Sequence, residues 1–255
     1  MKLRAFVFDL DGTVYRGNDP IPGAADFLTK LQDRGVPYLF VTNRGNRTPD
    51  QIADQLIAME IPCSEEMILT SSQVAARHLG AIRVFVVGET GVYTALEEVG
   101  ATVVGDHPDV VLVSYHRGFT YADLTQATRH ILAGARFVAT NRDSLIMVED
   151  GVLPEAGPLV SALENATNTT AEVIGKPNRI IMDEAVARLQ VAHEECVVVG
   201  DFLLTDILAA QNAEMPSALI LTGISSKADI PQAPCEPTWV AEDYADLERQ
   251  LFPLL

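Results

Sequence analysis

The stretch RAFVFDLDGTVYRG (residues 4–17) decides how the rest of the chain is interpreted. Its first half is a continuous apolar run, which is typical of a strand buried on both faces. Asp9 and Asp11 follow two residues apart, so both carboxylates would point to one face if the chain stayed extended. Gly12 permits a tight turn directly after them. The stretch therefore predicts a strand of a parallel sheet with two carboxylates at its carboxyl end.

Runs of the same kind recur along the chain, with helical patterns between them. AADFLTKLQDRG (24–35) keeps its apolar residues at helical spacing and ends on a glycine, which is a good helix stop. Alternating strands and helices predict βαβ units, so the expected fold class is α/β with a Rossmann-like parallel-sheet core. The runs expected to form core strands are RAFVFDL (4–10), PYLFVTN (37–43), ECVVVGD (195–201) and SALILTG (217–223).

The middle of the chain repeats this rhythm and predicts a second, smaller α/β unit. We expect residues 80–175 to form an inserted cap domain, with residues 1–79 and 176–255 as the core; the flanking motifs place these edges, because no linker composition marks them. The expected strands are RVFVVGE (83–89), DVVLVSY (109–115) and ARFVATN (135–141), and the expected helices are GVYTALEEVG (91–100) and YADLTQATRHILAG (121–134).

Composition limits the partners and the compartment. Thirty-five acidic and 18 basic residues give a formal net charge of −17, which repels nucleic acid and anionic lipid. A phosphate site in such a chain needs local positive charge from a metal, a lysine or backbone amides. No run approaches the ~20 apolar residues that span a bilayer, and three isolated cysteines are typical of a reducing compartment. We therefore expect a soluble, cytoplasmic protein that binds a small phosphorylated metabolite, with no nucleic-acid or membrane partner.

Polar residues follow the expected core strands at the edge where parallel sheets bind ligands. They are Asp9 with Asp11, Thr42 with Asn43, and Asp201. An ionised aspartate can attack phosphorus, and a second can protonate the leaving oxygen and later activate water. Two like charges this close need a cation, and Mg²⁺ prefers carboxylates, waters and substrate phosphate. A turn or a helix cap explains any one of these residues, but the conjunction favours a catalytic site.

Four motifs occur in a fixed order: DLDGTVYRG (9–17), VTNR (41–44), GKP (175–177) and GDFLLTD (200–206). Together they resemble the motifs of the haloacid dehalogenase superfamily of phosphatases. Their spacing is similar to that of the NagD and 4-nitrophenylphosphatase branch, in which a C2-type α/β cap is inserted between the second and third motifs. The resemblance covers nearly the whole chain and includes the segments PGAADFL, ATNRD and TGISS.

The resemblance implies a catalytic role for each matching residue. Asp9 would be the nucleophile, and Asp11 would be the general acid and base. Thr42 would hydrogen-bond the transferring phosphoryl oxygens, with Asn43 beside it, because neutral donors suit that task. Lys176 would neutralise the charge of the phosphate and of the aspartyl-phosphate.

The resemblance also implies a magnesium site. Asp9 and Asp201 would bind Mg²⁺ through their carboxylates, Asp11 would bind it through its backbone carbonyl, and Asp206 would hold metal-bound waters. Considered independently of the resemblance, Asp206 lies in TDILAA, which is typical of a helix start. Thr205 or Asp206 would then be a helix cap.

The chain departs from the family pattern at positions that are not catalytic. They are Arg44, Phe202, Leu203 and Leu204. Apolar side chains beside a metal site are expected to alter substrate contacts or cap docking more than the chemistry.

Two further pairs of residues have structural explanations. Asn141 and Asp143 in ATNRD resemble a feature of the family's cap, but a strand-ending turn with side-chain hydrogen bonds is the favoured explanation. Trp239 and Tyr244 fall in an expected final strand and helix, where aromatic residues belong to the core.

The sequence thus predicts a magnesium-dependent phosphatase that hydrolyses small phosphomonoesters through an aspartyl-phosphate. Nucleotide monophosphates, sugar phosphates and esters of the 4-nitrophenyl phosphate type are the expected substrates. Two alternatives stay open: a phosphotransferase, and a non-catalytic protein that binds a phosphorylated metabolite on the same scaffold. The resemblance also implies a homodimer formed through the cap.

Overall fold

The computed structural model describes residues 2–148 and 151–255 and divides into two compact units. Unit 1 comprises Met1–Thr42, Asp50–Leu69 and Lys176–Leu255, and unit 2 comprises Asn43–Pro49 and Thr70–Gly175. The predicted inserted domain spans residues 80–175. Unit 2 contains these residues and, in addition, segments 43–49 and 70–79. The identification of the insertion as a functional cap stays a prediction.

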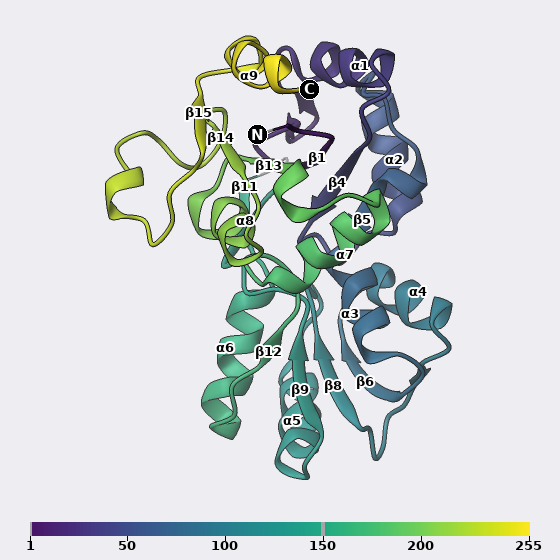
Figure 1. Ribbon diagram of the computed structural model, residues 1–255. Helices are drawn as coiled ribbons and strands as arrows, with labels where there is room; N and C mark the ends of the chain where they lie inside the picture. The colour runs from purple at the N-terminus through teal and green to yellow at the C-terminus, as the bar shows by residue number, and fades with distance from the viewer. Residues whose placement is uncertain (1, 149–150) are drawn as a thin grey trace. The chain divides into compact units, whose positions relative to one another are not determined.

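Unit 1 is built on a six-stranded sheet in the order β15-β14-β13-β1-β4-β5 (Figure 1). Central strand β1 pairs in parallel with β13 on one side and β4 on the other, so Phe8 lies between Val199 and Phe40. The sequence predicted five of these strands, all except β5, and they are confirmed. The six are β1 (Ala5–Phe8), β4 (Tyr38–Thr42), β5 (Ile68–Thr70), β13 (Cys196–Gly200), β14 (Ser217–Ile220) and β15 (Trp239–Ala241).

Helices cover both faces of this sheet, which explains why its strands are almost continuously apolar. Phe6 and Phe8 of β1 pack against Phe27 of α1 (Ala24–Asp33), in one cluster with residues of α2 (Pro49–Ala58) and α9 (Tyr244–Leu251). Figure 1 shows α7 (Arg179–Leu189) and α8 (Leu208–Asn212) on the opposite face from α1 and α9. A short hairpin, β2 (Tyr15–Arg16) and β3 (Asp19–Pro20), follows β1.

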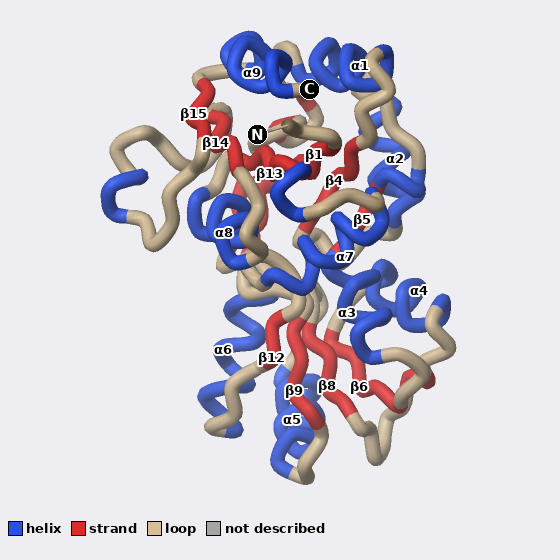
Figure 2. Tube along the Cα trace, in the orientation of Figure 1, coloured by secondary structure: helices blue, strands red, loops and turns tan. Residues whose placement is uncertain are grey.

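Unit 2 contains a five-stranded parallel sheet in the order β12-β9-β8-β6-β7. Its helices flank the sheet, as the colours in Figure 2 show. Phe85, Val111 and Phe137 on its strands pack with Ile131 of α5 and Leu163 of α6. The elements are α3 (Ser71–Leu79), β6 (Arg83–Val87), α4 (Thr90–Glu98), β7 (Thr102–Val103), β8 (Val110–Val113), α5 (Tyr121–Leu132), β9 (Arg136–Ala139), the antiparallel hairpin β10 (Leu145–Val148) and β11 (Gly151–Pro154), α6 (Ala156–Thr167) and β12 (Glu172–Val173).

The predicted fold class is confirmed: a parallel-sheet core with helices on its faces, and a further α/β unit with a smaller sheet. The predicted final strand and helix are β15 and α9, and Tyr244 is buried as expected. The β10–β11 hairpin and the short strands β5, β7 and β12 were not predicted. Among the described residues, no helix is both long and apolar enough to cross a membrane.

Candidate active site

Three predicted site residues meet at the carboxyl edge of the unit 1 sheet. Asp9 follows β1, and Asp201 follows the neighbouring strand β13. Together with Asp206, these residues offer carboxylate oxygens that lie within 4.8 Å of one another. We refer to Asp9, Asp201, Asp206 and Lys176 as the acidic cluster. The sequence predicted all four members as site residues, and the structure brings them together.

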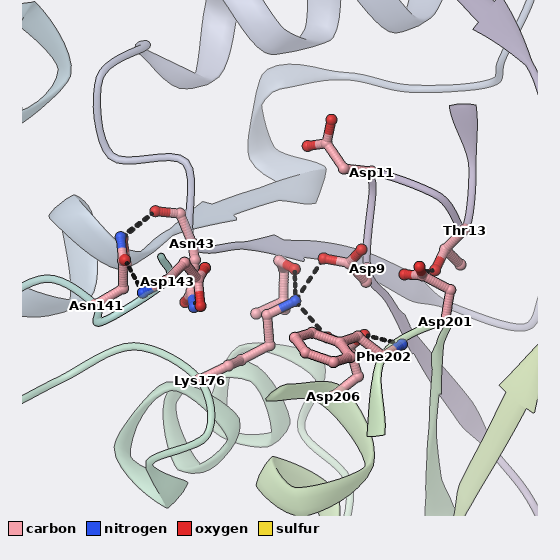
Figure 3. Close-up of polar contacts among 12 residues, drawn as sticks. Asp9, Asp11, Thr13, Asn43, Asn141, Asp143, Lys176, Asp201, Phe202 and Asp206 are labelled. Carbon is pink, nitrogen blue, oxygen red and sulfur yellow. Dashed lines mark hydrogen bonds and ion pairs between the residues drawn. The ribbon is translucent and has the colours of Figure 1, made fainter. Parts of the chain in front are cut away.

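Lys176 is the cationic member of the acidic cluster. Its Nζ donates to Asp9 Oδ1 at 2.5 Å and to Asp206 Oδ1 at 2.7 Å, as the dashed lines in Figure 3 show. It also donates to the backbone oxygen of Val41 at 3.1 Å, one residue before Thr42. The Lys176 side chain is only 3% exposed. Lys176 therefore holds the residues after β1, the end of β4 and Asp206 together.

Electrostatics in the acidic cluster favour an additional cation. Burial raises the pKa of Asp9 well above its usual value; the nearby Lys176 opposes the rise, and the charges of Asp206 and Asp201 add to it. Burial, followed by repulsion from Asp206, raises the pKa of Asp201 to about 7. Burial alone would lower the pKa of Lys176, but Asp206 and Asp9 raise it, so the lysine stays charged. Three carboxylates thus share one ammonium.

Asp206 lies on an unusual turn. The sequence predicted the start of a helix here, but residues Leu203–Ile207 form a π-helical turn before α8. Asp206 Oδ2 accepts from the backbone N–H of Phe202 at 3.1 Å, which ties the carboxylate back to the strand end. A Cβ at Gly200 would lie 2.3 Å from Asp206 Cβ, so only glycine fits there. The wide turn and the glycine bring Asp206 to Lys176, as π turns often do at functional sites.

The Asp11 carboxylate points away from the acidic cluster (Figure 3). The chain is not extended here as a shared face for Asp9 and Asp11 requires, because β1 ends at Phe8 and Gly12 turns with φ of 84°. Asp11 Oδ2 instead accepts from the Tyr15 hydroxyl at 3.3 Å, which is long for a bond of this type. Its predicted role as acid and base stays a prediction.

Thr42 and Asn43 have different surroundings. Thr42 ends β4 in unit 1 and is buried. Asn43 begins unit 2, where its Nδ2 donates to Asp143 Oδ2 at 2.9 Å. Its backbone oxygen accepts from Asn141 Nδ2 at 2.9 Å and from the Ser71 hydroxyl at 2.9 Å. The structure therefore gives Asn43 hydrogen bonds within unit 2, while its phosphate-binding role stays a prediction.

Asn43 belongs to a second group of polar residues, Asn43, Asn141, Asp143 and Glu155, which we refer to as the amide cluster; Asp143 is half-buried and the other three are buried. Asp143 N donates to Asn141 Oδ1 at 2.9 Å, which is the strand-ending turn that the sequence favoured. Asn141 Nδ2 also donates to Glu155 Oε1 at 3.3 Å. Burial raises the pKa of Glu155 to about 8. No local pattern predicts that Asn141 and Asp143 contact Asn43, about 100 residues earlier in the chain.

Sequence reasoning missed several residues that hold Asp201 in place. Thr13 Oγ1 donates to Asp201 Oδ1 at 3.2 Å, and the backbone N–H of Ile224 donates to Asp201 Oδ2 at 2.7 Å. The buried Tyr244 hydroxyl donates to the backbone oxygen of Thr13 at 3.0 Å. In the sequence, Thr13 and Ile224 stand out only as parts of family-like motifs, and Tyr244 stands out only as an aromatic core residue.

The residues that depart from the family pattern do not share one environment. Leu203 is buried and packs with Ile207, Leu219 and Cys235. The Leu204 side chain is 47% exposed. The prediction that apolar side chains alter substrate contacts or cap docking therefore applies to Leu204 and the half-buried Phe202. Leu203 belongs to the core.

The donor set of the acidic cluster fits a hard divalent cation. All three candidate ligands are carboxylates, and oxygen ligands are those that Mg²⁺ prefers. One or two carboxylates with waters and phosphate complete a typical magnesium shell, so the cluster supplies enough oxygen atoms. A cation there would also offset the surplus negative charge of the cluster.

Comparison with known proteins places the chain in a family. A family model described as haloacid dehalogenase-like hydrolase matches residues 6–102, and a second, described as HAD-hydrolase-like, matches residues 173–247. The first match contains the strands that carry Asp9 and Thr42. The second contains Lys176, Asp201 and Asp206.

Relatives match over nearly the whole chain. A curated 5'-nucleotidase of Bacillus subtilis is 41% identical over 239 residues, which are 92% of this chain and 93% of the relative. The structure of NagD from Escherichia coli superposes with a TM-score of 0.91 at 31% identity, covering 96% of this chain and 98% of NagD. A glycerol phosphate phosphatase of Mycobacterium tuberculosis, solved in complex with magnesium, superposes with a TM-score of 0.92 at 36% identity. The match covers 100% of this chain and 81% of that protein's chain. The chain belongs to the haloacid dehalogenase-like hydrolases, in the branch of NagD and the 4-nitrophenylphosphatases.

Proposed function

We propose that the chain hydrolyses small phosphomonoesters with Asp9 as nucleophile and Mg²⁺ as cofactor. The observation that carries the proposal is the acidic cluster, in which three carboxylates and the buried Lys176 meet at the carboxyl edge of the sheet. The relatives named as a nucleotidase and as a glycerol phosphate phosphatase support this reaction class. The branch to which the chain belongs also supports it.

The proposed reaction has two steps. In the first, an Asp9 oxygen attacks phosphorus, the bond from phosphorus to the ester oxygen breaks, and Asp11 gives that oxygen a proton. In the second, Asp11 takes a proton from a water whose oxygen attacks the phosphorus, and the bond from phosphorus to the Asp9 oxygen breaks, which releases inorganic phosphate and regenerates the Asp9 carboxylate. The Asp11 carboxylate, which accepts from the Tyr15 hydroxyl at 3.3 Å, would turn toward the ester oxygen for these proton transfers.

Other residues of the chain would stabilise the charge that develops. Lys176, already bonded to Asp9, would neutralise the phosphoryl group, and the Thr42 hydroxyl would donate to its oxygens. Asn43 is proposed to lie beside Thr42, as the resemblance implies. Lys176 is held by Asp9, Asp206 and the Val41 backbone oxygen before a substrate binds, so this residue would need little reorganisation during the reaction.

Asp9 and Asp201 would hold Mg²⁺ through their carboxylates, Asp11 would hold it through its backbone carbonyl, and Asp206 would bind the waters of the ion. When bound, the ion would neutralise phosphate oxygens and offset the repulsion among the carboxylates. The relative solved in complex with magnesium supports the choice of metal.

The substrate is proposed to be a small phosphorylated metabolite, such as a nucleoside monophosphate or a sugar or polyol phosphate. The net charge of −17 disfavours polyanionic partners. The three free cysteines fit a reducing compartment such as the cytoplasm. Unit 2 as a cap, and pairing of two chains through it, belong to the same proposal.

Release of inorganic phosphate from a panel of these esters, with and without Mg²⁺, tests the proposal. We expect release that requires Mg²⁺ and disappears in Asp9→Asn. Asp183→Asn is a matched control, because Asp183 lies on the surface, paired with Arg179. Absence of release from every ester, with the native chain and saturating metal, would favour a non-catalytic binding protein.

A further inference from the structure

The segment Thr222–Ser225 follows β14 and contacts the two loops that carry the carboxylates of the acidic cluster. β14 pairs with β13, and β13 pairs with β1, so the loops after these three strands leave the same edge of one sheet. The sequence showed this segment only as part of a family-like stretch. Its contacts assign it a place in the site.

On one side, the segment fixes Asp201. The backbone N–H of Ile224 donates to Asp201 Oδ2 at 2.7 Å, and that of Ser225 donates to the Asp201 backbone oxygen at 3.0 Å. Ser225 Oγ accepts from the N–H of Leu203 at 3.0 Å, just after Asp201. Ile224 therefore holds the side chain of Asp201, and Ser225 holds its backbone.

On the other side, the segment fixes the turn after Asp9. Thr222 Oγ1 donates to the backbone oxygen of Gly12 at 2.7 Å. The Arg16 guanidinium donates to the Thr222 backbone oxygen, which ties the β2–β3 hairpin to the same point. The adjacent Thr13 hydroxyl donates to Asp201 Oδ1, so the two loops also contact each other directly.

The backbone at two glycines packs closely against the Asp201 carboxylate. A Cβ at Gly223 would lie 1.8 Å from Asp201 Oδ2, and one at Gly12 would lie 2.5 Å from the same atom. The backbone therefore approaches this oxygen from both sides. Together with the two donors, this packing selects one orientation of the Asp201 carboxylate.

We propose that Thr222–Ser225 is a positioning segment that orients Asp201 relative to Asp9 and thereby sets the affinity of the acidic cluster for a divalent cation. The inference rests on the proposed function, because it assumes that the cluster binds metal. Residues that orient metal ligands typically change metal affinity ~10–100-fold when they are mutated. A loop that only packed against the sheet would change stability and leave metal affinity unaltered.

Ser225→Ala and Thr222→Val each remove one hydroxyl hydrogen bond without adding bulk. Thr238→Val is the matched control, because Thr238 Oγ1 accepts from Ser217 N at the opposite end of β14. Binding of Mn²⁺ alone, followed by electron paramagnetic resonance of the free ion, reports affinity without turnover. Thermal midpoints of the metal-free proteins report whether each variant folds.

We expect the dissociation constant for Mn²⁺ to rise about tenfold or more in Ser225→Ala and Thr222→Val, with native affinity in Thr238→Val. Native affinity in both test variants would overturn the inference while leaving the proposed function intact. A native chain that binds no Mn²⁺ would overturn both the inference and the metal part of the proposed function. Should one variant fail to fold, the other decides the outcome.

Discussion

The acidic cluster of unit 1 and the amide cluster of unit 2 are both largely buried groups of polar side chains, but they balance charge differently. In the acidic cluster, three carboxylates share the single ammonium of Lys176. In the amide cluster, Asp143 and Glu155 accept hydrogen bonds from the amides of Asn43 and Asn141. Uncompensated charge is costly to bury, whereas a satisfied hydrogen bond is not. The surplus of carboxylates over cations makes the acidic cluster the candidate cation site, whereas side-chain amides hydrogen-bond the carboxylates of the amide cluster.

The largest effect is expected from Lys176→Met, which removes the only ammonium of the acidic cluster. Breaking a buried pair from one side costs about 3–5 kcal/mol, so the free energy of unfolding without metal should fall by that amount at neutral pH. Lys30→Met is the control, because Lys30 forms an exposed pair with Glu248 that is worth less than about 1 kcal/mol. Urea unfolding measures both variants; an equal loss in the two would contradict the role of Lys176.

The variants Asp201→Asn and Asp143→Asn each remove one carboxylate, the first from the acidic cluster and the second from the amide cluster. Mg²⁺ at about 100 times its dissociation constant should stabilise the native chain by about 2.7 kcal/mol. This stabilisation should vanish in Asp201→Asn and persist in Asp143→Asn, because only Asp201 lies among the candidate metal ligands. Thermal midpoints with and without Mg²⁺ provide the measurement. A response lost in both variants would remove the distinction between the clusters.

The pH dependence of stability should reveal Glu155 in the amide cluster. Burial raises the pKa of Glu155 from 4.5 to about 8, so the folded chain binds more protons than the unfolded chain between these values. The contribution of Glu155 is therefore fully present below pH 4.5 and is lost as pH rises through about 8. Relative to Glu155→Gln, the native chain should lose up to about 1.4 kcal/mol per pH unit in this window.

Urea unfolding of the native chain and Glu155→Gln at several pH values between 5 and 8.5 measures this change. The change with pH in the difference between the two free energies of unfolding is more informative than the difference at any one pH. Both Glu155 oxygens accept hydrogen bonds and glutamine offers one acceptor, so the substitution also changes stability at every pH. Parallel stability curves for the two proteins would show that Glu155 is not protonated in the folded state.

The smallest effect is expected at Leu204, next to the π turn. Its side chain is 47% exposed, so Leu204→Ala should change the free energy of unfolding by less than about 0.5 kcal/mol. Leu203→Ala should cost about 2–5 kcal/mol, because Leu203 is buried against Ile207 and Leu219. A different ester preference in Leu204→Ala would show that this departure from the family pattern affects substrate contacts.

The sequence predicted the strands and the acidic residues because both leave local signals. Buried parallel strands are short apolar runs, and Asp9 and Asp201 directly follow two of them. The order of adjacent strands then brings residues almost 200 positions apart to one edge. Lys176 carried no such signal of its own and was identified through the family motif around it.

The remaining features depend on contacts that a local pattern does not contain. The π turn at Leu203–Ile207 needs Gly200 and the bond from Phe202 N to Asp206, and its sequence also suits an ordinary helix start. The direction of the Asp11 side chain depends on the turn at Gly12. This turn ends the alternation of side-chain directions that an extended chain would have. The bonds of Asn43 join residues about 100 positions apart.

The central claim, that Asp9 is the nucleophile, is tested most directly by trapping its phosphorylated form. Asp11→Asn should remove the base that activates water, and 4-nitrophenyl phosphate has a leaving group that needs little help from an acid. Rapid acid quenching of this variant with Mg²⁺ and substrate, followed by peptide mass spectrometry, should find one phosphoryl group on Asp9. A native chain that releases phosphate, while the variant shows no phosphoryl group on Asp9 at any quench time or shows it on another residue, would contradict the account.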